Sequence, residues 1–234
     1  MSNQGNVWEK EYNNPKLVTK KEDPQADTLR FLKFLKKTAK IELENLNILD
    51  LGCGTGRNSN YLAKLGNNVT GIEISKTALS LAQARAKEQG LLVNYILGDI
   101  GEPYDLKNSS MDIILDITSS NSLNEKGREV YLKETSRVLK EGLPAQAGGY
   151  FFVRALCKDG DKNAKNLLKT NPGKEYDTYI IKEIGLTERV FSKEDFIKIY
   201  SKYFKIIKLE KKSGYTRFNN RVYKRDYWLA YLTK

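Results

Sequence analysis

Three glycines at alternate positions, directly after a short apolar run, constrain this chain more than any other stretch. The run Ile48–Leu51 has the length and composition of a buried strand, and Asp50 lies near its end. The segment Asn58–Leu65 then has the character of a helix. The turn between them carries Gly52, Gly54 and Gly56. Strand, glycine-rich turn and helix form the opening unit of a nucleotide-binding α/β sheet, because glycine lets the chain turn sharply and lets a ligand approach the backbone.

The spacing of these glycines distinguishes between kinds of nucleotide site. A dinucleotide fingerprint needs its third glycine one residue later, where this chain has Arg57. A P-loop needs a Gly-Lys-Ser/Thr sequence, which does not follow the strand. The pattern acid-x-Gly-x-Gly-x-Gly from Asp50 to Gly56 instead resembles the first motif of class I S-adenosylmethionine-dependent methyltransferases. The resemblance implies a doubly wound, mostly parallel seven-stranded sheet with an antiparallel last strand, and S-adenosylmethionine as the methyl donor.

Two further acids at predicted strand ends support the resemblance. The second strand, Val69–Ile74, contains Glu73 near its end, where an acid accepts hydrogen bonds from ribose hydroxyls in this architecture. The third strand, Val93–Ile100, ends in Gly-Asp-Ile. The resemblance implies that Asp99 accepts from the adenine amino group and that Ile100 packs on the ring. Each acid alone could be a surface charge, but three strand-end motifs in this order favour a cofactor site.

We therefore predict one site for S-adenosylmethionine, and for its product S-adenosylhomocysteine, at the carboxyl ends of the parallel strands. The predicted cofactor-binding residues follow the first four strands: Asp50, Gly52, Cys53, Gly54, Gly56, Arg57, Glu73, Ile74, Asp99, Ile100 and Asp116.

The predicted fourth strand is Met111–Ile117, and the segment Asp116–Leu123 at its end is dense in small polar groups. In the fold that the resemblance implies, this strand is the one nearest the transferable methyl. Asp116 is the best-placed carboxylate to orient or deprotonate an acceptor, and we predict it to be catalytic. The alternative is that Asp116 only caps the loop through backbone N–H groups. Ser119 and Asn121 are predicted to bind the acceptor. The Asn-Pro-Pro-Tyr type of motif is absent here, which argues against nucleobase amines and glutamine amides as acceptors.

The N-terminal segment, residues 1–23, places Trp8 and Tyr12 four residues apart on one helical face. Many small-molecule methyltransferases begin with a similar segment that folds over the cofactor. We therefore predict a lid in which Tyr12 contacts the acceptor and takes part in catalysis. The alternative is an aromatic anchor that only packs against the core.

Residues 24–234 are predicted to form a single methyltransferase domain. The later strands are expected at Tyr150–Leu156, Phe204–Leu209 and Asp226–Leu232. Residues 157–192 form a long Lys-rich insertion on the substrate side, and connections of this length are usually functional or mobile. Residues 143–148 interrupt the family pattern before the fifth strand, and we expect a surface excursion without function.

Composition limits the chemistry. The 234 residues suffice for one α/β domain with additions, and the absence of an 18-residue apolar run predicts no transmembrane helix. The chain has no histidine, which excludes histidine general bases, and its two cysteines alone make no zinc site. We expect a cytoplasmic protein without a metal. The sequence does not indicate an oligomeric state.

Charge points to the acceptor. The formal net charge is +11, and residues 141–234 alone hold 20 basic and 11 acidic side chains. Six of those cations and three aromatic residues fall within 211–225, expected as a loop on the substrate face. Arginine matches carboxylate and phosphate oxygens, so we predict acceptor contacts from Tyr215, Arg217 and Arg221. The alternative is a solvated β-hairpin.

The sequence as a whole favours methyl transfer from S-adenosylmethionine to a small, anionic acceptor. One rival is an RNA or protein methyltransferase that uses the basic C-terminal part, so a nucleic acid stays open as a partner. Another rival is a non-catalytic subunit that binds S-adenosylmethionine and activates a partner protein.

Overall fold

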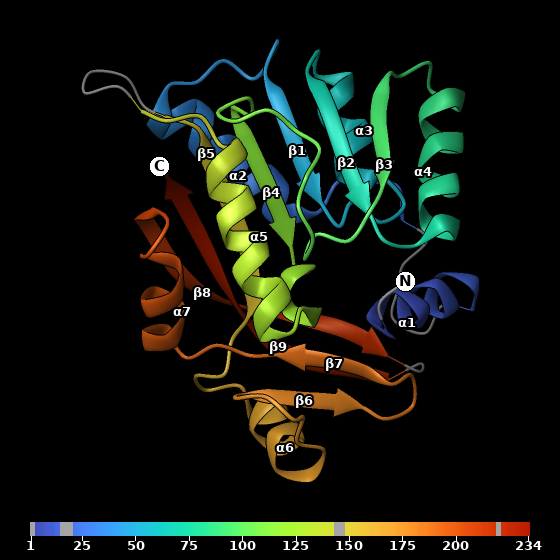
Figure 1. Ribbon diagram of the computed structural model, residues 1–234, viewed down its shortest axis with the longest axis vertical. Helices are drawn as coiled ribbons and strands as arrows, with labels where there is room; N and C mark the ends of the chain where they lie inside the picture. Colours follow the sequence, from blue (N-terminus) through green and yellow to red (C-terminus); the bar gives the residue numbers. More distant parts are fainter. Residues whose placement is uncertain (1–2, 15–20, 143–147, 219–220) are drawn as a thin grey trace.

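The computed structural model describes residues 3–14, 21–142, 148–218 and 221–234, and its centre is a seven-stranded sheet (Figure 1). The strand order is β3-β2-β1-β4-β5-β9-β8. The strands are β1 (Asn47–Leu51), β2 (Asn68–Glu73), β3 (Val93–Leu97), β4 (Ile113–Ile117), β5 (Tyr150–Leu156), β8 (Lys205–Phe218) and β9 (Arg221–Thr233). Strands β1 to β5 are parallel, and β9 runs antiparallel to both β5 and β8. The predicted fold class is confirmed.

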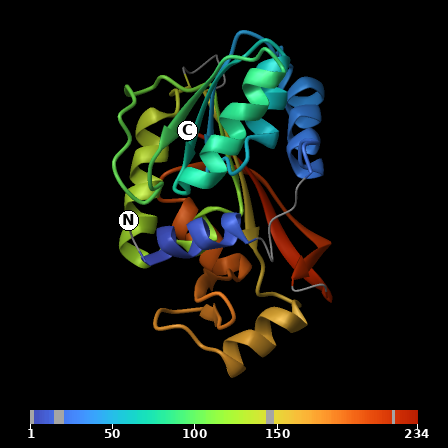
Figure 2. The same ribbon diagram turned by 90° about the vertical axis from the view of Figure 1, so that its right-hand side faces the viewer.

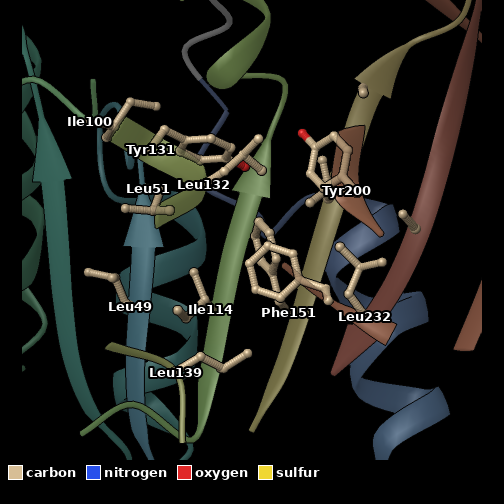
Figure 3. Close-up of a cluster of buried hydrophobic side chains, with 14 of the residues drawn as sticks. Leu49, Leu51, Ile100, Ile114, Tyr131, Leu132, Leu139, Phe151, Tyr200 and Leu232 are labelled. Atoms are coloured by element: carbon tan, nitrogen blue, oxygen red, sulfur yellow. The ribbon is translucent and has the colours of Figure 1, made fainter. Parts of the chain in front are cut away.

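Helices cover both faces of the sheet because its strands alternate apolar side chains between two cores. Leu49 and Leu51 of β1 point to one core, shared with α5 (Glu125–Val138) and α7 (Lys193–Tyr200). Ile48 points to the other core, shared with α2 (Ala26–Phe34) and α3 (Arg57–Lys64). Figure 3 shows the first core, where Phe151 of β5 lies among side chains from the central strands and the covering helices.

Local signals in the sequence set the helix boundaries. Ser75 precedes α4 (Lys76–Glu88), and its hydroxyl accepts a hydrogen bond of 3.1 Å from the N–H of Ala78. Ser192 caps α7 in the same way through the N–H of Asp195. Helix α4 ends before Gly90, which has a φ of +65°. Helix α2 continues into a π-helical turn, Leu35–Ala39.

The insertion 157–192 is more ordered than its weak periodicity suggested. It contains α6 (Lys162–Thr170) and a separate two-stranded antiparallel sheet of β6 (Thr178–Ile181) and β7 (Leu186–Arg189). Asp161 caps α6 by accepting from the N–H of Ala164 at 2.8 Å. The insertion lies beyond the carboxyl ends of the parallel strands, and α1 (Asn3–Asn13) lies between the two (Figures 1 and 2).

The region 211–225 is not a loop, which corrects one prediction. Strands β8 and β9 stay paired from Lys205–Thr233 to Phe218–Arg221. The sequence placed their ends at Leu209 and Asp226 because apolar residues thin out there, although backbone pairing continues. Of the predicted excursion 143–148, residues 143–147 lie outside the described part. No helix within the described residues is both long and apolar enough to cross a membrane.

Replacing Phe151 should show how much this core contributes to stability. Its ring is fully buried, 6.2 Å from the Tyr131 ring and 5.1 Å from the Phe204 ring between centroids. We expect Phe151→Ala to lower the free energy of unfolding by about 3–5 kcal/mol. The matched control is Leu92→Ala, since Leu92 is 93% exposed and should change stability by less than about 0.5 kcal/mol. Urea titration measures both, and equal losses in the two variants would contradict the assignment of the core.

Candidate active site

A cavity of about 1090 Å³ opens at the carboxyl ends of the parallel strands. It lies where the strand order reverses, between β1 and β4, which is the usual ligand position in an open α/β sheet. Its walls come from α1, the glycine-rich turn, the loop after β4, the insertion and β9. Pockets for one small ligand are usually about 300–1,000 Å³, so this cavity has room for a donor and an acceptor together.

The three glycines of the turn have different neighbours although all three have positive φ, +67°, +56° and +79°. A side chain at Gly52 would collide with Ser119, and one at Gly56 with Tyr95 and Ala82. Those two glycines therefore let protein segments pack together. A Cβ at Gly54 would meet a single group, the Tyr12 hydroxyl from α1, at 2.7 Å. Of the three glycines, Gly54 is thus the one whose Cβ position meets no described group except the Tyr12 side chain.

Glu73 fastens the turn to the end of β2. One carboxylate oxygen accepts from the N–H of Gly54 at 2.8 Å, and the other accepts from the N–H of Ser75 at 2.9 Å. Burial raises the pKa of Glu73, and these N–H donors oppose that rise. A carboxylate offers about four lone-pair positions, so Glu73 keeps acceptor capacity toward the cavity that it lines. This geometry fits the predicted contact with ribose hydroxyls.

Two more predicted acids border the cavity. Asp50 is 2% exposed and accepts from the Ser59 hydroxyl at 2.6 Å. Burial raises its pKa to about 6. Asp99 is half-buried, and one of its oxygens accepts from the N–H of Gly101 at 2.8 Å. The predicted cofactor residues that line the cavity are Asp50, Gly52, Cys53, Gly54, Arg57, Glu73, Ile74, Asp99 and Ile100; Gly56 and Asp116 do not.

Asp116 is fully buried behind the loop that follows β4. It accepts from the Tyr131 hydroxyl at 2.6 Å and from the N–H groups of Ser119 at 2.8 Å and Ser120 at 3.3 Å. Burial raises its pKa, and these hydrogen bonds oppose the rise. The geometry favours the alternative considered for this residue, a loop cap, over contact with donor or acceptor.

The loop after β4 presents residues that the sequence pattern only partly identified. Ser119 lines the cavity as predicted, whereas Asn121 is buried away from it and accepts from the N–H of Leu156 at 3.3 Å. Thr118 also lines the cavity and has a φ of +70°, a strained value for a β-branched residue. Strain of this kind gathers at functional sites, but no feature of the sequence announces it.

Helix α1 covers the glycine-rich turn, with the Tyr12 hydroxyl next to Gly54. Glu9 accepts from the Ser75 hydroxyl at 2.7 Å and from the N–H of Thr77 at 3.2 Å, which docks α1 on the start of α4. Trp8 and Tyr12 both line the cavity, with ring centroids 6.3 Å apart. Burial and the neighbouring Glu73 carboxylate raise the pKa of Tyr12 well above its usual value. The Tyr12 hydroxyl therefore keeps its proton at neutral pH and has an O–H to donate.

The hairpin formed by β8 and β9 contributes residues to the cavity other than those predicted. Tyr215 is 77% exposed and Arg221 is exposed, and neither lines the cavity. The side chain of Arg217 lies outside the described part. Side chains alternate along a strand, so the cavity receives Thr216, Tyr223, Arg225 and Tyr227 instead. The structure therefore does not bring Tyr215 and Arg221 into the cavity, and their contacts with an acceptor stay a prediction.

Arg154 is the functional candidate that the sequence analysis missed. It lies in β5, whose other six residues are apolar or aromatic, and it lines the cavity near the carboxyl end of the strand. A charge inside an otherwise apolar strand was a readable signal, because central parallel strands are buried on both faces. Arg57, at the first position of α3, lines the same region as predicted.

The fold and the cavity together resemble those of class I methyltransferases. Residues 48–142 match the family model described as a methyltransferase domain. The ubiquinone biosynthesis O-methyltransferase of Pelagibacter ubique is 30% identical over 135 residues, which are 57% of this chain and 50% of that protein. The chain thus matches about half the length of the curated relatives compared here.

Solved structures share the fold over almost the whole chain. An S-adenosylmethionine-dependent methyltransferase from Methanosarcina mazei has a TM-score of 0.73 at 23% identity, covering 91% of this chain and 98% of that one. Another is the 1,6-didemethyltoxoflavin-N1-methyltransferase of Burkholderia thailandensis, whose crystal structure contains 1,6-didemethyltoxoflavin and S-adenosylhomocysteine. Its TM-score is 0.67 at 16% identity, and the match covers 99% of this chain and 88% of that one. Residues 48–142 of this chain thus match a methyltransferase domain, and the chain has the fold of S-adenosylmethionine-dependent methyltransferases.

A pair of glycine variants should separate ligand contact from backbone strain. Gly54 and Gly90 both have positive φ, but a Cβ at Gly90 meets no atom of the described residues within 4 Å. Each change to alanine should cost about 1–2 kcal/mol of stability through the left-handed backbone. Only Gly54→Ala should weaken S-adenosylhomocysteine binding, by about tenfold or more, which equals about 1.4 kcal/mol. Calorimetry measures the affinities, and equal affinity in both variants would refute the role of Gly54.

The pKa of Asp50 predicts a pH dependence of donor binding. Its ordinary value is 3.8 and the folded value is about 6, so the carboxylate loses its charge as the pH falls from 7 to 5. S-adenosylmethionine carries a positive sulfonium, and its affinity should fall over this range by up to about 1–3 kcal/mol, the value of a charged interaction. Asp50→Asn should remove the dependence. Titrations at fixed ionic strength test this, and a variant that keeps the wild-type pH profile would contradict it.

Proposed function

We propose that this chain transfers a methyl group from S-adenosylmethionine to a small, negatively charged acceptor. One observation carries the proposal: a single cavity joins the glycine-rich turn, Glu73 and Asp99 to a second compartment formed by the insertion and β9. The first compartment has the acids and the open turn that a nucleoside with an amino-acid tail requires. The second has polar and charged walls, and its charged residues are Lys174, Glu175, Glu183, Glu188 and Arg225.

The protein's contribution is to position two reactants. When bound, the donor supplies a methyl carbon that an acceptor lone pair attacks while the electrons of the carbon–sulfur bond pass to sulfur. Glu73 and Asp99 hold the nucleoside, and the backbone at Gly54 accommodates the part of the donor that crosses the turn. Positioning of this kind can lower a barrier by about 7–11 kcal/mol without a covalent intermediate.

Tyr12 acts on the acceptor as a hydrogen-bond donor. Its raised pKa keeps the phenol protonated, so it orients the attacking atom and does not remove its proton. The chain has no histidine for that task, and Asp116 is occupied within the loop. An acceptor that is already ionised, or one that loses its proton to water, suits this site.

A small acceptor fits better than a nucleic acid. Residues 1–23 serve as a lid in this proposal, since α1 contacts α4 and β7 and contributes Trp8 and Tyr12 to the cavity. Two hairpin cations are engaged inside the protein, Lys212 with Asp27 at 2.5 Å and Arg225 with Asp161 at 3.3 Å. Fewer cations are therefore left to hold a phosphate backbone, which binding of nucleic acid depends on.

The test is transfer of label from S-adenosylmethionine into a cell extract separated into small molecules, RNA and protein. We expect label in the small molecules. Once an acceptor is identified, Tyr12→Phe should lower kcat with little change in donor KM. Glu73→Gln should weaken donor binding by about 1–3 kcal/mol.

The rivals predict other outcomes for the same experiment. Label in RNA or protein would overturn the small acceptor. Binding of S-adenosylhomocysteine without any transfer would favour the non-catalytic subunit. As a control, Lys87→Gln removes an exposed charge on α4, outside the cavity, and should behave as wild type.

A further inference from the structure

A chain of hydrogen-bonded polar side chains joins the insertion to β9. Its members are Asp161 at the start of α6, Tyr179 on β6, Glu188 on β7 and Arg225 on β9. Asp161 accepts from Nε of Arg225 at 3.3 Å and from the N–H of Asp226 at 2.8 Å. Nη2 of Arg225 donates to the Tyr179 hydroxyl at 2.7 Å, and that hydroxyl donates to Oε2 of Glu188. Three elements of the insertion are therefore fastened to the main sheet through one arginine.

The end groups of this chain fix the direction of every hydrogen bond in it. A guanidinium only donates and an ionised carboxylate only accepts, so the O–H of Tyr179 points to Glu188. Arg225 uses Nε and Nη2 inside the protein, and no described residue accepts from its Nη1. No described residue donates to Oε1 of Glu188. Both side chains line the cavity, so a donor and an acceptor linked by one hydroxyl border the same compartment.

The other charged residues of this compartment provide no such pair. Lys174 and Glu183 are exposed. Both carboxylate oxygens of Glu175 accept from a backbone N–H at the start of α5. With Arg225 and Glu188, the compartment holds two cations against three acids, so charge alone does not explain what it would recognise. Its distinctive feature is a buried donor held beside a half-buried acceptor.

Aromatic side chains flank the donor on β9. Residues two apart on a strand face the same side, and Tyr223, Arg225 and Tyr227 all line the cavity. The Tyr227 hydroxyl is fixed by a 2.7 Å hydrogen bond with the hydroxyl of Thr216. Aromatic side chains beside a polar pair favour a flat ligand, because rings gain from offset or edge contacts with one another.

We propose that Arg225 and Glu188 form a binding site for an uncharged lactam or amide group of the acceptor. In such a group the carbonyl oxygen accepts from Nη1 of Arg225, and the neighbouring N–H donates to Oε1 of Glu188. Each contact is a hydrogen bond to an ionised partner, which is stronger than one between neutral groups. The inference deepens the proposed function and rests on it for the identity of the ligand. The negative charge of the acceptor then belongs to its attacking atom, near the donor.

NMR titration of the intact chain, saturated with S-adenosylhomocysteine, tests the site with two probes. 2-Pyridone carries the carbonyl and the N–H of a lactam on a flat ring, and N-methyl-2-pyridone keeps the carbonyl but lacks the N–H. Wild type should bind 2-pyridone about tenfold more tightly, since it makes one more hydrogen bond to a charged group. The variants are Glu188→Gln and Arg225→Lys. The matched control is Glu88→Gln, the same change at an exposed position of α4 outside the cavity.

The two variants should change binding in different ways. Glu188→Gln keeps one oxygen for the Tyr179 hydroxyl and turns its NH₂ toward the probe, so it should weaken 2-pyridone about tenfold and leave N-methyl-2-pyridone unchanged. Arg225→Lys keeps a charge next to Asp161 but loses the fork, so it should weaken both probes by a similar factor, because both carry the carbonyl. Glu88→Gln should behave as wild type. A network that only fastens the insertion would not distinguish a probe with an N–H from one without it.

The site is overturned if wild type binds the two probes equally or binds neither, and this comparison needs no variant. It is also overturned if Glu188→Gln keeps the wild-type preference, or if Arg225→Lys binds both probes as tightly as wild type, while the variant is folded by circular dichroism. Failure of the proposed function looks different. If wild type does not bind S-adenosylhomocysteine, the donor assignment fails, and the two probes on the protein alone still decide whether the pair binds a lactam.

Discussion

The two hydrogen bonds that Glu73 accepts hold together the part of the structure on which the others depend. They join the N–H of Gly54 to the end of β2, and the N–H of Ser75 to the same carboxylate. Ser75 caps α4 and donates to Glu9, so α1 rests on the same element. Glu73 therefore links the glycine-rich turn, α4 and α1. These contacts explain why Glu73 is buried despite the free-energy cost of burying a charge.

The donor half of the site could be predicted because its signals are local. Asp50, Glu73 and Asp99 each follow an apolar run within a few residues, and parallel strands bring their carboxyl ends to one edge. The acceptor half could not be predicted to the same degree. Whether Tyr215 or Thr216 faces the cavity depends on the register between β8 and β9, and a shift of one residue exchanges the two faces.

Two acids at equivalent positions in the sequence pattern can have different roles, because burial gives them different hydrogen-bond partners. Asp116 follows the same strand-end rule as Asp50, yet its hydrogen bonds from Tyr131, Ser119 and Ser120 turn it into the support of a loop. The sequence shows the acid but not its partners, since Tyr131 is 15 residues away on α5. Loop support has a use here, because the supported loop holds the strained Thr118 against the cavity.

The ion pairs in the structure change what the charge distribution along the chain indicates about the acceptor. The basic C-terminal part suggested an exposed rim, but Lys212 and Arg225 turn inward to acids on α2 and before α6. Lys212 pairs with one carboxylate oxygen of Asp27, and the Nε of Arg154 lies 3.4 Å from the other. The lining of the cavity holds acids as well as cations, among them Asp50, Glu73 and Arg154, so the internal pairing of the hairpin, and not the net charge of the chain, determines which charges the cavity presents.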